Sequence, residues 1–260
     1  MKNNPEAELL KLSFENMLVQ WGQSAPLRTS LHASSVLVKD EEWCVRRHVL
    51  ADLFPDEAVQ PELQPWDWRT QAIFENGWDL HKRWQKIFLK YANVVYGNTN
   101  NVQDETATVA PELDLIHYDP TRNLFFSPDA ILEFAGQRYV VEIKGVKQEV
   151  YQELTDDLTV AMESCETVHK AVHQANLYMH LLELKKAIIL IENKNNQDFK
   201  LWVIEYDREM AEKPIFRVYE VKKSVALHRL PARICQSRGD ALARKCPLRD
   251  CCFSEKMEVE

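Results

Sequence analysis

The sequence predicts an α/β fold in which a central mixed β-sheet is flanked by helices. Short apolar runs rich in β-branched residues, typical of strands, alternate along the chain with longer amphipathic stretches typical of helices. The 6 glycines form neither a GxGxxG nor a GxxxxGK[ST] pattern. The composition therefore argues against a dinucleotide-binding fingerprint, a P-loop and an ATP-driven motor.

Each predicted element rests on periodicity. Apolar positions at helical spacing predict helices over 6–22, 30–54, 69–95 and 163–184. A hairpin is predicted within 127–145, with a tight turn at 135–136, and two further strands over 187–193 and 199–207. Polar composition predicts loops or connections over 54–68, 97–110 and 147–157, and helix or irregular chain over 208–230.

Length and composition favour one globular domain spanning 1–260, with a core at 69–210 and a cysteine region joining 35–60 to 230–253. Hydrophobic residues make up 45% and charged residues 28%, as in soluble proteins. No apolar run of about 18 residues predicts a membrane span. The N-terminal stretch contains acids and no continuous apolar segment, which is unlike a secretory signal. We therefore expect a cytoplasmic protein.

The charge distribution is uneven. The net charge of -8 argues mildly against a surface that grips nucleic acid throughout. Segment 222–249, however, carries eight lysines and arginines against one acid, Asp240. A local basic surface is expected there, with an ordinary solvated face as the alternative.

The predicted hairpin gathers chemically useful side chains. Alternation along its second strand puts Glu142 and Lys144 on one face, with Ile143 turned away. Strand pairing can bring Asp129, near the start of the first strand, to the same end of the sheet. Two carboxylates suit a hard cation such as Mg²⁺ or Mn²⁺, and Lys144 would lie beside the attacking water. An exposed ladder of charges on an edge strand is the alternative.

Two helices contribute further candidates. His81 borders the apolar stripe of the helix over 69–95, where a histidine is ordinarily a hydrogen-bonded core residue. Gln174 and Tyr178 are four residues apart, hence on one face of the helix over 163–184. Such a pair can hold a nucleic-acid strand or line the rim of the core.

The cysteines cluster at the C-terminal end. Four of the six, Cys235, Cys246, Cys251 and Cys252, lie close together, whereas Cys44 stands far upstream. In a reducing compartment clustered thiols favour metal over disulfides, although their spacing is not that of a zinc finger, ribbon or RING. Three thiolates leave a tetrahedral site one ligand short, and Cys44 could supply it. The pattern leaves three alternatives, which are an iron-sulfur cluster, a zinc ion and uncoordinated reduced thiols.

Together these pieces resemble the RecB-like branch of the PD-(D/E)xK nuclease superfamily. The resemblance spans about residues 35–253 and rests on GWDLHKRWQ, SPDAI, VVEIKG and HQANLYMHL occurring in that order. One cysteine before the core and three after it resemble the iron-sulfur arrangement of the CRISPR-associated RecB-like exonucleases and the AddB-type subunits. The ten-residue spacing between Cys235 and Cys246 departs from those relatives, and Cys251 offers a competing thiol.

The resemblance implies a role for each matched residue. His81, Asp129, Glu142 and the backbone carbonyl of Ile143 would be metal ligands, and Lys144 would orient or activate the water. Gln174 and Tyr178 would contact DNA near the scissile phosphate. The cluster ligands would be Cys44, Cys235, Cys246 and Cys252, holding [4Fe-4S].

The expected function is that of a Mg²⁺- or Mn²⁺-dependent DNA exonuclease acting on single strands or duplex ends, in DNA processing, recombination or repair. A helicase or recombination protein would be its partner for unwinding. One alternative is a structure-specific or restriction-type endonuclease. Another is a non-catalytic iron-sulfur module that binds DNA or docks a partner, although the complete His, Asp, Glu and Lys set argues against a vestigial site.

Overall fold

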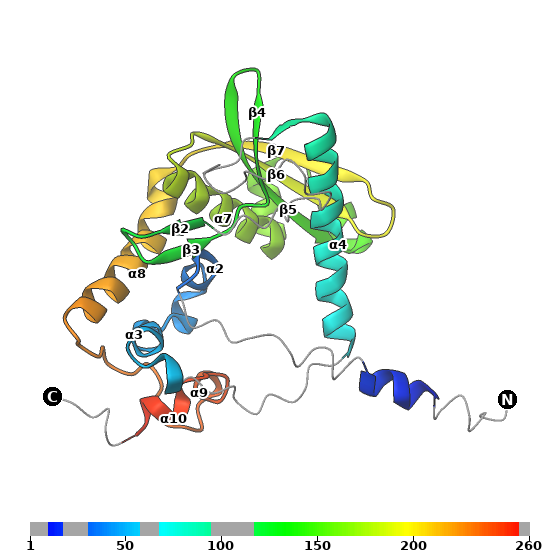
Figure 1. The fold of residues 1–260 in the computed structure, drawn as a ribbon. Helices are drawn as coiled ribbons and strands as arrows, with labels where there is room; N and C mark the ends of the chain where they lie inside the picture. Colours follow the sequence, from blue (N-terminus) through cyan, green and yellow to red (C-terminus); the bar gives the residue numbers. More distant parts are fainter. Residues whose placement is uncertain (1–9, 18–30, 58–67, 95–116, 255–260) are drawn as a thin grey trace, which may run out of the picture.

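The computed structural model describes residues 10–17, 31–57, 68–94 and 117–254. Its centre is a five-stranded sheet of order β1-β4-β5-β6-β7, in which β5 and β6 are parallel and the other neighbouring pairs are antiparallel. Helices lie on both faces of this sheet (Figure 1). The predicted mixed α/β architecture is therefore confirmed.

The described elements have the following bounds. The strands are β1 Asn93–Val94, β2 His117–Asp119, β3 Leu124–Phe126, β4 Ala130–Phe134, β5 Gln137–Val146, β6 Lys186–Asn193 and β7 Phe199–Glu205. The helices are α2 Ala33–Val36, α3 Val45–Leu53, α4 Trp68–Tyr91, α5 Gln148–Glu153, α6 Leu158–Ser164, α7 Glu166–Leu182, α8 Arg208–Ala226, α9 Ala241–Arg244 and α10 Arg249–Cys252, with 3-10 turns at Asp40–Glu42 and Pro55–Glu57. Residues 10–17 are also helical.

The predicted hairpin is formed by β4 and β5. Its two turn residues have positive φ, 50° at Ala135 and 74° at Gly136, as the two-residue turn that matches strand twist requires. β5 then continues beyond its partner, and α5, α6 and α7 carry the chain back to β6. Such a crossover is necessary because a tight turn cannot join parallel strands.

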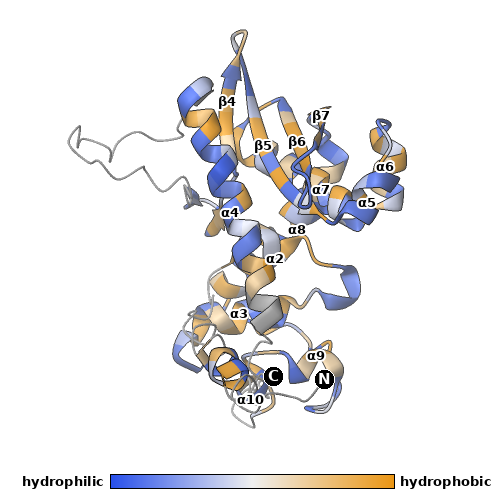
Figure 2. Cartoon of the chain, turned by 90° about the vertical axis from the view of Figure 1, so that its right-hand side faces the viewer, coloured by the Kyte–Doolittle hydropathy of each residue, from blue (hydrophilic) through white to orange (hydrophobic). Residues whose placement is uncertain are grey.

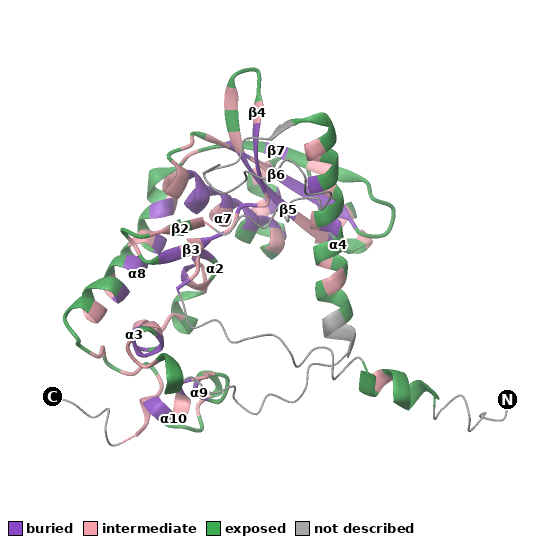
Figure 3. Ribbon diagram, viewed as in Figure 1, coloured by how far each residue is buried: buried purple, intermediate pink, exposed green. Residues whose placement is uncertain are grey.

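The sheet separates two apolar clusters. The larger lies between one face and α7, and includes Val140, Ile189 and Leu177. The smaller lies under α4 on the other face and includes Leu80, Val141 and Ile143. Figure 3 shows buried residues concentrated in the central strands and α7, whereas much of α4 is exposed. α4 therefore covers its face of the sheet only in part.

A third apolar cluster joins distant parts of the chain. Leu50 and Ala51 of α3 pack with Leu248 and Cys251 at the C-terminal end. Figure 2 shows α3, α9 and α10 gathered on one side of the sheet domain. The domain boundaries predicted from the sequence remain a prediction, but these two segments are in contact.

Several element predictions need correction. The helix predicted over 30–54 is broken into α2, a 3-10 turn and α3, and the connection predicted over 147–157 contains α5. The helix predicted to begin at 163 is two helices that meet at Cys165, where the backbone is extended. Strand β1 and the β2–β3 hairpin were not predicted, because two- and three-residue strands carry no readable alternation. The loop predicted over 97–110 lies entirely outside the described residues.

In the described ranges, none of the helices combines the length and the apolar character that a bilayer crossing requires.

We predict that folding stability depends on the protonation of His48 in α3. Burial, with the charge of Arg47 adding to it, lowers the pKa of His48 from 6.5 to about 4, and the ring stacks on Trp43 at 4.8 Å between centroids. Below pH 6.5 His48 is protonated in the unfolded chain but stays neutral in the folded chain. The free energy of unfolding therefore decreases as the pH falls from 6.5 toward 4. The expected loss between pH 7 and pH 4.5 is on the order of 2–3 kcal/mol.

Urea denaturation of the wild type and of His48→Phe across this pH range measures that loss. The phenyl ring keeps the stacking but cannot titrate, so the variant should lose less stability in acid. Equal acid sensitivity of the two proteins would contradict the assignment.

Candidate active site

Strand pairing brings two carboxylates together at one end of the β4–β5 hairpin. Ala130 pairs with Val141, so continuing the antiparallel register by one residue places Asp129 opposite Glu142. Directly opposite side chains project from the same face. The convergence expected from the sequence is therefore present in the backbone register.

Asp129 is held on both of its carboxylate oxygens. Its Oδ1 lies 2.9 Å from Nδ1 of His81 on α4, and its Oδ2 accepts the backbone N–H of Ile143 at 2.6 Å. The Asp129 side chain thus connects α4, through His81, with β5, through Ile143. His81 is not simply a core residue, because its ring reaches the carboxylate cluster.

Glu142 and Lys144 form an ion pair in the same place. The Lys144 ammonium contacts Oε1 of Glu142, whose side chain is completely buried, whereas the Lys144 side chain is 27% exposed. Oε2 of Glu142 is also buried and has no hydrogen-bond partner among the described residues. A buried acceptor without a partner costs free energy, so this oxygen is open to a cation or a donor.

The pKa shifts have a common cause. Burial raises the pKa of Glu142 despite the opposing charge of Lys144. Burial lowers the pKa of Lys144, but the Glu142 and Asp129 carboxylates outweigh it and hold that pKa above its usual value. Burial likewise lowers the pKa of His81, but the hydrogen bond to Asp129 and the negative charges of Asp129 and Glu142 together outweigh it and raise that pKa. All three shifts reflect excess negative charge in a desolvated site, which added positive charge would relieve.

The donor set suits a hard divalent cation in its chemistry. Two carboxylates, one of them with an unpartnered buried oxygen, and an imidazole meet the preference of Mg²⁺ or Mn²⁺ for oxygen ligands supplemented by nitrogen. As these side chains stand, they are paired with one another. Among the described residues no group of three or more His, Cys, Asp or Glu side chains is arranged to hold a metal ion.

Three contacts hold α4 against the strands of the site. Gln85 donates to the backbone carbonyl of Asp129 at 3.0 Å. Trp84 donates its indole N–H to Glu192 of β6 at 2.7 Å, and Arg83 contacts the same buried carboxylate. All three contacts follow His81 within four residues along the helix, and they hold this part of α4 against Asp129 and β6.

A fourth close approach, between Leu80 of α4 and Gly145 of β5, requires a glycine. A Cβ at Gly145 would lie 2.7 Å from Cδ1 of Leu80 and 2.6 Å from Cε of Lys194. Leu80 is only 4% exposed and has little room to move aside. The strand position after Lys144 is therefore a glycine because α4 lies directly on it.

Gln174 and Tyr178 lie together on α7, as their spacing predicted. Gln174 donates to the Tyr178 hydroxyl at 2.8 Å, and the backbone N–H of Ser127 bonds to the same hydroxyl. Burial raises the pKa of Tyr178, and Glu142 adds to that shift. Tyr178 is fully buried, whereas Gln174 is only half-buried. In this conformation Tyr178 supports the segment leading into β4, and Gln174 is the member of the pair that solvent reaches.

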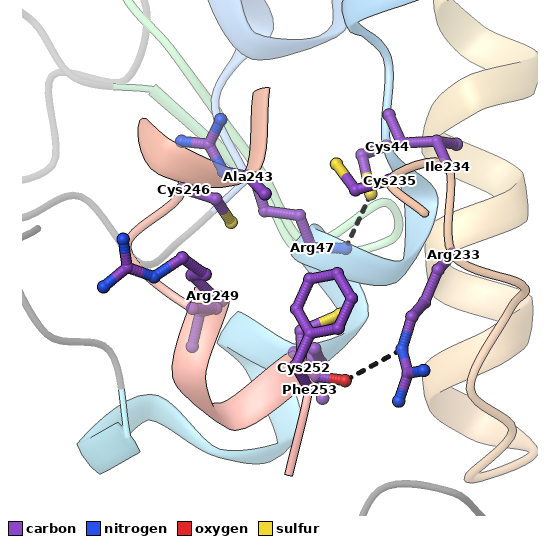
Figure 4. Close-up of a pocket in the computed structure, with 12 residues that line it drawn as sticks. Cys44, Arg47, Arg233, Ile234, Cys235, Ala243, Cys246, Arg249, Cys252 and Phe253 are labelled. Atoms are coloured by element: carbon purple, nitrogen blue, oxygen red, sulfur yellow. Dashed lines mark hydrogen bonds between the residues drawn. The ribbon is translucent and has the colours of Figure 1, made fainter. Parts of the chain in front are cut away.

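The cysteines implied by the resemblance line one pocket. Cys44, Cys235, Cys246 and Cys252 all border it, together with Arg47 and other residues from both ends of the chain (Figure 4). Cys44 Sγ accepts the backbone N–H of Arg47 at 3.4 Å. Burial raises the pKa of Cys44, and the three other thiols add to that shift, which reflects their proximity.

Cys251 occupies a different environment. It belongs to the apolar cluster with Leu50 and Leu248, and it does not line the pocket. Its neighbour Cys252 does. Cys251, which the sequence offered as an alternative ligand to Cys252, is thus buried in the apolar cluster and not in the pocket.

Sequence reasoning missed the residues that anchor α4. Glu192 carried a usable signal, since it is an acid within the apolar run of β6 and is 2% exposed. Gln85 and Gly145 carried none, because their roles arise from a helix packing on a strand far away in the sequence. Direct contact of Tyr178 with DNA, a role taken from the resemblance, conflicts with its complete burial in this conformation.

The chain has distant structural neighbours. No known protein family and no curated protein matches it. Similar solved structures include SSO0001, at 11% identity and a TM-score of 0.38 over 96% of this chain and 98% of that one. The alkaline exonuclease LHK-Exo from Laribacter hongkongensis has 11% identity and a TM-score of 0.46, and its complex with dAMP has 11% identity and a TM-score of 0.44, each over 77% of this chain and 89% of that one. Similarity at these levels does not establish a family.

We predict that Gly145→Ala destabilises the protein by about 1–3 kcal/mol, because the added methyl group overpacks the interface with α4. Leu80 must shift, and His81 next to it shifts as well. Urea denaturation measures the loss, and the double variant Gly145→Ala with Leu80→Ala tests its origin. The two losses should be non-additive, since removing the leucine makes room for the methyl group.

Gly77→Ala is the matched control in the same helix. A Cβ there meets nothing within 4 Å, so helix propensity should stabilise the protein by about 0.5–1 kcal/mol. Strict additivity of the Gly145 and Leu80 losses would show that the close approach does not determine how α4 is seated.

Proposed function

We propose that the protein is a metal-dependent deoxyribonuclease, more specifically an exonuclease acting on single-stranded DNA or duplex ends. The observation that carries this proposal is the convergence of Asp129, Glu142, Lys144 and His81 in one desolvated site with an unpartnered carboxylate oxygen. Carboxylates and a histidine can bind a divalent cation, and a lysine can act on the attacking water, which are functions that metal-dependent phosphodiester hydrolysis uses.

Each side chain has a distinct task in this proposal. Asp129, Glu142 and His81 would hold Mg²⁺ or Mn²⁺, with the Ile143 carbonyl as a fourth ligand. A bound cation supplies Lewis acidity and charge neutralisation at the phosphodiester. Lys144 keeps its proton in this acidic environment, so it would orient the attacking water by donating a hydrogen bond and would stabilise developing negative charge.

The surrounding elements support nucleic-acid binding. Gln174 lies half-buried beside Tyr178 and would contact the DNA, whereas Tyr178 would hold the Ser127 segment from behind. The basic segment 222–249 would contact phosphates without reading sequence. Processive unwinding would fall to a separate helicase or recombination partner.

The cysteine pocket is proposed to hold a [4Fe-4S] cluster, with zinc as the lesser possibility. Cys44, Cys235, Cys246 and Cys252 supply four thiols in one pocket, which matches the ligand count of either group. Its proposed role is structural, because the pocket joins α3 to the C-terminal segment.

We predict that Lys144→Ala lowers DNA cleavage by about 10²–10⁴-fold while changing DNA affinity by no more than a few-fold. The measurement uses 5′- and 3′-labelled linear single strands beside a closed circle, with Mn²⁺ and with EDTA. Digestion of linear DNA alone is expected, and the label released first gives the polarity.

Lys170→Ala is the control, since Lys170 pairs with Glu166 on the exposed side of α7. It should cleave as the wild type does. Cutting of the circle would favour an endonuclease. If the wild type cleaves nothing with either metal, the enzymatic proposal fails and a binding module becomes the better account.

We predict that anaerobically purified protein contains about four iron and four sulfide ions per chain, and that Cys252→Ala loses them. Cys251→Ala is the matched variant one residue away, outside the pocket, and should retain the iron. Elemental analysis with ultraviolet-visible spectroscopy distinguishes the outcomes. Bound zinc would replace the cluster assignment, and equal loss in both variants would contradict the choice of Cys252.

A further inference from the structure

The α4 helix carries an exposed tryptophan next to the candidate active site. Trp78 is 60% exposed, although tryptophan is on average one of the more buried residues. Within the described residues its indole makes neither a hydrogen bond nor a ring contact. Figure 3 shows that much of α4 is exposed.

Helix geometry places this indole on the flank that faces the carboxylates. Trp78 precedes His81 by three residues, which is a rise of about 4.5 Å and a rotation of about 60°. It lies within about 20° of Gln85, two turns further along, and Gln85 donates to the backbone of Asp129. Trp78 therefore projects on the same flank of α4 as His81 and Gln85, the two residues that contact Asp129.

We propose that Trp78 is a stacking platform for an unpaired base close to the scissile phosphate. This inference rests on the proposed nuclease function and deepens it, since it names single-stranded DNA as the substrate form that the site takes. An indole face can stack on any base, and such contacts are sequence-tolerant. In an intact duplex the base faces are already stacked, so this contact is available only in a single strand or a frayed end.

The charges nearby fit this assignment in part. Lys82 and Lys86 follow Trp78 at i+4 and i+8 on exposed positions, and neither forms an ion pair within the described residues. They can contact phosphates on either side of a stacked base. Glu75 and Asp79 also lie toward the outside of α4, and their negative charges offset those of the two lysines. The proposal therefore rests on the exposed indole and not on the local charge.

The test is DNA affinity measured without cleavage. Full-length Lys144→Ala protein is the parent, and fluorescence anisotropy gives the affinity for a labelled single strand and for a blunt duplex. Adding Trp78→Ala should weaken single-strand binding about 5–100-fold and duplex binding less than about two-fold. Trp78→Phe should restore most of the loss, because a phenyl ring still stacks.

Two controls identify the contact. Phe216→Ala removes an aromatic residue that is 58% exposed on α8 and should leave both affinities unchanged. Abasic substitutions placed along the strand should include one position where the Trp78→Ala loss disappears, since a missing base cannot stack. Circular dichroism verifies that α4 remains folded.

The possible results distinguish the stacking role of Trp78 from the proposed nuclease activity. Single-strand affinity of Trp78→Ala within two-fold of the parent, or an equal loss on single strand and duplex, overturns the stacking role even if the wild type cleaves DNA. An equal loss with every strand, abasic or not, points to a general effect on α4 and overturns it too. A wild type that cleaves nothing refutes the nuclease, while the anisotropy series still decides whether Trp78 stacks on DNA.

Discussion

The fold of this protein has to accommodate a carboxylate buried inside the sheet. Glu142 is completely buried on the central strand β5, where an unpaired charge would cost several kcal/mol. Lys144, two residues further along the same face of β5, pairs its ammonium with one oxygen of Glu142. The other oxygen has no hydrogen-bond partner within the described residues. Asp129 brings a second negative charge opposite the first. The strand pairing that completes the sheet therefore also creates a site that is short of positive charge.

The α4 helix links this electrostatic site to the rest of the molecule. Its C-terminal half is seated on the sheet through Leu80, Trp84 and Gln85, and it delivers His81 to Asp129. Its N-terminal half extends past the sheet and exposes apolar side chains. A helix built in this way can position a ligand precisely at one end and present a binding surface at the other. In the proposed function, packing and substrate contact would thus use different turns of one element.

The cysteine region raises a different physical problem. Among the described residues, its apolar cluster has four buried members, Leu50, Ala51, Leu248 and Cys251, and so little buried apolar surface stabilises a small unit weakly. Small units of this kind ordinarily need a metal or a disulfide. Four thiols line the adjoining pocket, although in the described part of the chain no three His, Cys, Asp or Glu side chains are arranged to hold a metal ion. Because the thiols come from segments about 190 residues apart (Cys44 and Cys235), a metal or cluster there would also close most of the chain into a loop.

The sequence was informative where a residue's role depends on local periodicity. The turn at 135–136, the shared face of Glu142 and Lys144, and the paired Gln174 and Tyr178 all follow from spacing within one element. The anchoring by Glu192 and the close approach at Gly145 arise only when α4 packs on strands that lie more than 50 residues later in the sequence. Burial of Tyr178 is likewise a property of the assembled core. Periodicity predicts which face of its helix or strand a side chain occupies. Tertiary packing decides what covers that face. The contacts that hold the candidate active site in place arise from this packing.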